Sequence, residues 1–220
     1  ATGFAAGEAM VAGNAARGAD PVNGASTVDI AVSGGGLTFT DITATNAGHD
    51  VTLNASGAIG GNNITAARTV LVNGGSVAVT GATTATANSV TVNGGSSASL
   101  GSLSAATSGA VTAGTINVGT ATTGSTLNLN ATGSTLTLGS ATSGGDVTLA
   151  AQTRATLGPI TATGRNVTLS AMDADVNGNI AAAQINVIDR AAGANPLRLG
   201  DGAPGSGGFA LSQAEFNRLN

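Results

Sequence analysis

The stretch that decides the fold is Gly145–Ala171, which reads GDVTLAAQTRATLGPITATGRNVTLSA. It contains two near-copies of one phrase, GDVTLAA at its start and GRNVTLSA at its end, so that Val147 in the first copy corresponds to Val167 in the second. A second strand-like phrase begins at Ile160, between the two copies. The interval from Val147 to Val167, on the order of 20 residues, is typical of solenoid proteins, in which each repeat packs only against its neighbours.

The same spacing extends over most of the chain. Val51, Val70 and Val90 open phrases at nearly equal intervals, and the one irregular interval is the shorter one from Val111 to Leu127. Each phrase alternates apolar and polar residues, as a short strand with one buried face does. Two such strands in each coil of about 20 residues predict an all-β, right-handed parallel β-helix.

The pattern also predicts the limits and the core of this β-helix. We expect an irregular segment at residues 1–24, the β-helix at residues 25–200, and a loop with a short helix at residues 201–220. Ser212 and Glu215 have the spacing of a capping box, which predicts that this helix covers the last coil. The residues predicted to point inward are Val51, Leu53, Ile64, Val147, Leu149, Ile160, Val167, Leu169 and Ile180.

The composition narrows the possible functions. Charged residues make up 8% of the chain, well below the roughly 25% of ordinary domains. All seven basic residues are Arg and lie scattered along the sequence, which does not favour nucleic-acid binding. No apolar run approaches the roughly 20 residues of a membrane span, so we expect no membrane insertion. The chain has no Cys, which excludes disulfides and thiolate chemistry.

Asp50, Asp146 and Asn166 each precede the Val that opens a strand. A stack of carboxylates there would suit metal binding or acid–base catalysis, whereas an Asx turn would only cap the corner of the coil. Because Asn replaces Asp at this place, the capping role is favoured.

Four asparagines occupy another repeated place, three residues after the first apolar residue of a coil. This arrangement predicts a ladder of stacked amides that hydrogen-bond from coil to coil. Its members are Asn54, Asn73, Asn93 and Asn130.

One segment resembles the start of an EF-hand calcium loop. Asp173, Asp175 and Asn177 would supply oxygen ligands, together with the carbonyl of Asn179. Gln184 stands where the loop normally has a bidentate Glu, which would make any calcium site weak. The alternative is a plain turn before the next strand, since Asp, Asn and Gly are ordinary turn residues. We expect no other cofactor.

Catalysis is not predicted. The single histidine, His49, has no Ser-His-Asp arrangement around it, and the aromatic platforms of polysaccharide-active β-helix lyases and hydrolases are missing. Such an enzyme remains the first alternative. Ice binding is a further alternative, suggested by the Thr-rich segments 83–86 and 120–123, although the Thr-x-Thr unit does not recur at one place in every coil.

The chain also resembles a known family. The phrases GDVTLAA, GPITATGRNVTLSA, GNIAAAQINV and LRLGDGAPGSGGFALSQAEFNRL are similar to the repeat region of filamentous haemagglutinin-type adhesins, over roughly Val28 to Leu219. Those are long bacterial proteins exported by two-partner secretion. The resemblance implies a right-handed β-helix, a secreted or cell-surface location, and a role in adhesion, biofilm formation or contact with other cells through a host or bacterial surface receptor.

The ends of a β-helix have open strand edges, which are templates for further pairing. We therefore expect either a longer parent chain or head-to-tail stacking into filaments, because contacts of that kind propagate without closing.

Overall fold

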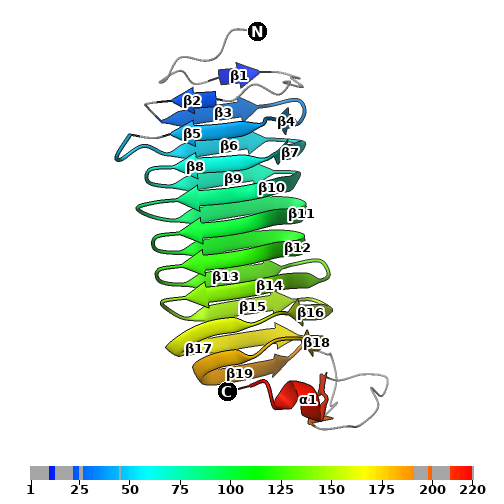
Figure 1. The fold of residues 1–220 in the computed structure, drawn as a ribbon. Coiled ribbons are helices and arrows are strands. Elements are labelled where there is room, and N and C mark those ends of the chain that lie inside the picture. Colours follow the sequence, from blue (N-terminus) through cyan, green and yellow to red (C-terminus); the bar gives the residue numbers. More distant parts are fainter. Residues whose placement is uncertain are drawn as a thin grey trace.

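A computed structural model describes residues 10–12, 22–24, 27–44, 46–190, 198–199 and 209–219. It is a parallel β-solenoid of about 8 turns with about 19 residues per turn, and a short helix lies near the C-terminus. Figure 1 shows the turns stacked into a rod with β3 (Val28–Val32) near one end and β19 (Ile180–Asp189) near the other. The predicted all-β solenoid is confirmed.

Each turn has three strand segments, where the sequence analysis predicted two. Equivalent segments of successive turns pair in parallel and form three walls of the rod. The first wall runs from β3 to β19 through β6 (Val51–Ala55), β9 (Val70–Gly74), β11 (Val90–Ala105), β12 (Gly109–Thr123), β13 (Leu127–Ala131), β15 (Val147–Ala151) and β17 (Ile160–Ala171). β1 (Met10–Ala12) pairs with β3 ahead of it.

The second wall was not predicted as a third strand of each turn. It runs through β4 (Leu37–Thr38), β7 (Ala58–Gly61), β10 (Ser76–Ala85), the middles of β11 and β12, β14 (Leu136–Ser143), β16 (Arg154–Leu157) and β18 (Asp173–Val176). Some of its inward residues are as small as Ala98, Ala155 and Ala174, and these alternate with larger ones such as Leu100 and Leu157.

The third wall contains the second strand-like phrase of each coil, such as the one that begins at Ile160. It runs through β2 (Val22–Gly24), β5 (Asp41–Ala44) and β8 (Asn63–Ala66), continues along the ends of β10, β11, β12 and β14, and ends with the starts of β17 and β19. The strands that bend around a corner, and so belong to more than one wall, are β10, β11, β12, β14, β17 and β19.

The core is a continuous column of aliphatic side chains between the three walls. All nine residues predicted to point inward are fully or almost fully buried. The irregular interval of the sequence disappears in the structure, because Gly109 and not Val111 pairs with Val90 and Leu127. A Cβ at Gly109 would lie 2.6 Å from Leu103 Cδ2, so the Leu side chain fills the space of the missing Val.

The C-terminal segment covers part of the last turn. Phe209 and Leu211 are buried, and β21 (Ala210–Leu211) lies against β18 and pairs with β20 (Arg198–Leu199). The predicted capping box at Ser212 and Glu215 is present and opens α1 (Gln213–Phe216). Leu219 then forms a bridge with Ile180 on the third wall. Within residues 1–24, the described strands β1 and β2 already pair in parallel with later turns.

Candidate functional site

The corner before the first wall holds the carboxylates that the sequence analysis singled out. Asp50 Oδ1 accepts a hydrogen bond from the backbone N–H of Thr69 at 2.9 Å, and Asp146 Oδ1 accepts one from Asn166 N–H at 2.9 Å. In each case the acceptor side chain caps the corner of the next turn. The capping role is confirmed for Asp50 and Asp146, but it acts between turns and not as an Asx turn within one, and Asn166 takes part through its backbone N–H.

These two carboxylates do not form a pair. The register of the first wall places Asp50 beside Thr69 and Asp146 beside Thr126, with several turns between the two Asp residues. Asp50 instead pairs with Arg68, whose Nε lies 2.8 Å from Oδ1. The hydrogen bond from Arg68 holds the pKa of the Asp50 carboxyl below its ordinary value.

His49 lies beside this corner. Its Nδ1 is 3.2 Å from Thr27 Oγ1, one turn away along the rod. Which of the two groups donates the hydrogen bond depends on the tautomer of the imidazole.

The calcium-loop residues lie partly on a strand. Asp173 and Asp175 are outward positions of β18, which corrects the prediction of a turn across this whole segment. Arg154 of β16 pairs with both carboxylates, with Nε 3.6 Å from Asp173 Oδ2. Because β16 and β18 are parallel neighbours, the cation of one turn faces the two anions of the next.

The two amide residues of the same segment follow the strand. The backbone N–H of Asn177 donates to Leu157 O at 2.7 Å, and the Asn179 carbonyl accepts from Ile160 N–H at 2.9 Å. The carbonyl assigned to calcium is thus part of the bonding between turns. Among the described residues, no group of three or more His, Cys, Asp or Glu side chains is placed to hold a metal ion. Calcium binding by Asp173, Asp175, Asn177 and Asn179 stays a prediction.

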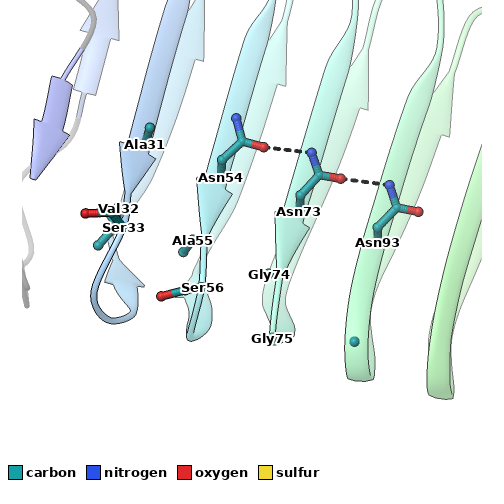
Figure 2. Close-up of a pocket in the computed structure, with 11 residues that line it drawn as sticks. Ala31, Val32, Ser33, Asn54, Ala55, Ser56, Asn73, Gly74, Gly75 and Asn93 are labelled. Atoms are coloured by element: carbon teal, nitrogen blue, oxygen red, sulfur yellow. Dashed lines mark hydrogen bonds between the residues drawn. The ribbon is translucent and has the colours of Figure 1, made fainter. Parts of the chain in front are cut away.

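The amide ladder has three bonded members. Asn73 Nδ2 donates to Asn54 Oδ1 and Asn93 Nδ2 donates to Asn73 Oδ1, both at 2.7 Å, as the dashed lines of Figure 2 mark. Asn130 lies on the same line of the first wall, but Thr112 stands between it and Asn93. The predicted ladder is confirmed for the first three asparagines.

A groove of about 680 Å³ follows this ladder along the rod. Figure 2 shows the three amides in a row beside the glycine corner of Gly74 and Gly75. The residues that line the groove carry no charge. Each ladder amide uses one N–H or one lone pair for each neighbour, so further donor and acceptor capacity remains for a partner at the surface. We call this concave surface the amide groove.

Comparison of the chain with protein-family profiles, with curated proteins and with solved structures finds no match. Within the described residues, no helix is long and apolar enough to cross a membrane.

Proposed function

We propose that this chain is a structural and adhesive segment of a secreted or cell-surface bacterial adhesin. The observation that carries the proposal is the fold itself: a stack of turns that holds a long surface of Thr, Ser and Asn side chains outward. The resemblance of its repeats to filamentous haemagglutinin-type adhesins supports the same role. The proposal gives the chain no catalytic function.

End-to-end association is part of the proposal. Ile185–Asp189 forms the last strand of the first wall, and in the described part of the chain no strand pairs with its outer edge. Ile185 and Val187 are only partly buried there, and Ile188 is 50% exposed. An open edge next to apolar side chains favours pairing with a further turn, either of a longer parent chain or of a second copy.

Adhesion is tested with the purified chain coupled to beads. The beads are expected to bind bacterial or host cells, and Asn73→Arg, which introduces charge and bulk into the amide groove, is expected to weaken binding more than Thr156→Arg on the second wall. Wild-type beads that bind no cell type would contradict an adhesive role. Cleavage of a uronate polymer that one Asp→Asn change abolishes would instead favour the enzyme alternative.

Stacking is tested separately by sedimentation and small-angle scattering over a range of concentrations. Ile188→Lys places a charge beside the open edge and is expected to reduce association. A strictly monomeric wild-type rod at high concentration would contradict the stacking part of the proposal alone.

A further inference from the structure

The third wall carries a hydroxyl side chain at the same outward position in consecutive turns. The strand register aligns these residues one above the next, although their sequence contexts differ. The hydroxyl row, as we call it, consists of Thr43, Thr65, Thr84, Ser104, Thr122, Thr142 and Thr161. The whole Thr-x-Thr unit does not recur in every turn, as the sequence analysis stated, but a single hydroxyl position does.

A second, shorter row lies beside the first on the same wall. Ser102, Thr120 and Ser140 align in three consecutive turns, two residues before Ser104, Thr122 and Thr142. Neighbouring turns are about 4.8 Å apart, and residues two apart on a strand are roughly 6.6 Å apart. The two rows together form a two-dimensional array of hydroxyl groups, with a methyl group beside each Thr hydroxyl.

The residues of this array are uncharged. In the described part of the third wall, the only charged outward residue is Asp41 at the N-terminal end, and its carboxylate accepts a hydrogen bond from Asn63 Nδ2 at 2.7 Å. The second wall, in contrast, carries Arg154 and its two Asp partners. Beyond Asp41, the described part of this wall offers no ion pairs to a macromolecular partner, and it also lacks the aromatic anchors that dominate protein interfaces.

The hydroxyl groups of the array have no partner within the described part of the protein. Threonines at the corners behave differently: Thr86 Oγ1 donates to Ala67 O at 3.0 Å, and Thr107 Oγ1 donates to Asn88 Oδ1 at 3.0 Å. The corner hydroxyls thus hold the turns together, whereas those of the hydroxyl row keep their donor and both acceptor sites for solvent.

The array is also rigid. Each strand of its interior is hydrogen-bonded to a parallel neighbour on both sides, and a β-branched Thr side chain has a restricted χ1 angle. Hydroxyl groups held at fixed, repeating positions can occupy sites of a water lattice, and the methyl groups beside them favour removal from liquid water.

From these observations we propose that the third wall binds ice. The spacings along and across the rows are comparable with the oxygen repeats of hexagonal ice, so that the hydroxyls replace lattice waters over several turns at once. This function is independent of adhesion through the amide groove, which lies at the far end of the first-wall strands.

The test uses the whole chain and measures thermal hysteresis and incorporation into a growing ice hemisphere. Thr122→Lys is expected to abolish most of both, because a long cation in the centre of the array separates its flanks from the lattice. The control is Thr148→Lys, which changes an exposed outward Thr of the first wall and is expected to keep wild-type activity.

Circular dichroism melts of both variants establish that each remains folded, and Thr142→Lys serves as a second substitution in the same row. A wild-type chain without thermal hysteresis or ice incorporation would overturn the proposal. Equal loss in Thr122→Lys and Thr148→Lys would overturn it as well, since the activity would then not belong to the third wall.

Discussion

Asp50 connects three turns through one residue. Its carboxylate accepts hydrogen bonds from Arg68 and from the backbone of Thr69, and its own backbone N–H lies 3.4 Å from Thr27 Oγ1. The corner residue is therefore a cross-link along the rod, which is a role that its place in the sequence does not specify.

Asp50→Asn is expected to lower stability at neutral pH. The carboxyl pKa is lowered in the folded state, so its contribution is present above the unfolded value near 3.8 and is lost as the pH falls through the lower folded value. Urea unfolding across this range should therefore give wild type and variant curves that converge in acid. Asp29→Asn, which removes a carboxylate without a hydrogen bond or ion pair among the described residues, is the control, and the same convergence there would contradict the assignment.

The amide ladder marks how far single residues can be predicted from this sequence. Asn54, Asn73 and Asn93 were predicted correctly because the interval between successive members equals one turn. Asn130 shares the place but not the bond, because its neighbour Thr112 has no amide. The repeat thus predicts which position of the turn a residue occupies. Whether its side chain forms a hydrogen bond depends also on the residue at the same position one turn away.

At the scale of the element, the corner between the second and third walls is built on glycines. A Cβ at Gly139 would lie 2.3 Å from Gly119 O, and a Cβ at Gly119 would lie 2.4 Å from Gly101 O. The backbones of successive turns come so close at this corner that no side chain fits between them.

Gly139→Ala is expected to destabilise the rod by about 1–3 kcal/mol, the usual range for overpacking. The new methyl group meets the backbone of the neighbouring turn, which cannot move without disturbing the hydrogen bonds between turns. Gly60→Ala is the matched control, because nothing lies within 4 Å of a Cβ there. Chemical denaturation compares the two, and an equal loss in both would contradict close approach as the reason for glycine at this corner.

The elements themselves were only partly predictable. The first and third walls follow from strong alternation around residues such as Leu149 and Ile160, which are buried as expected. The second wall was not predicted as a strand of every turn; at Ala155 and Ala174 its inward residues are small and give a weak apolar signal. Gly109 was missed as the start of a strand for a related reason, since Leu103 from another wall supplies the volume that its own position lacks.

At the scale of the whole molecule, the C-terminal segment stabilises the end of the rod. Phe209 is fully buried, and its backbone N–H donates to Asp189 Oδ2 at 3.2 Å. Glu215 accepts a hydrogen bond from Val176 N–H at 3.0 Å, which ties the helix to the second wall. Of the apolar residues at this helix, Leu211 is buried whereas Phe216 is 43% exposed.

Phe209→Ala is therefore expected to cost about 3–5 kcal/mol, as large-to-small changes of buried aromatics do. Because each turn contacts only its neighbours, the loss should concentrate in the last turns. Hydrogen exchange followed by mass spectrometry locates it, with faster exchange expected in β18 and β19 and little change in β9. Phe216→Ala is the control, and a similar response to both substitutions would contradict a packing role for Phe209.

The strand register, finally, determines how the rod responds to tension. The hydrogen bonds between turns point along the rod, and β3 and β19 lie near its opposite ends (Figure 1). A pull between the ends therefore loads the bonds of one turn at a time, as in a zipper. Each turn of about 19 residues that opens releases roughly 60 Å of chain. In an optical trap the molecule should extend in small, similar steps at low force, so that in the adhesive role proposed above a cell held by such a tether would be slowed gradually and stay attached.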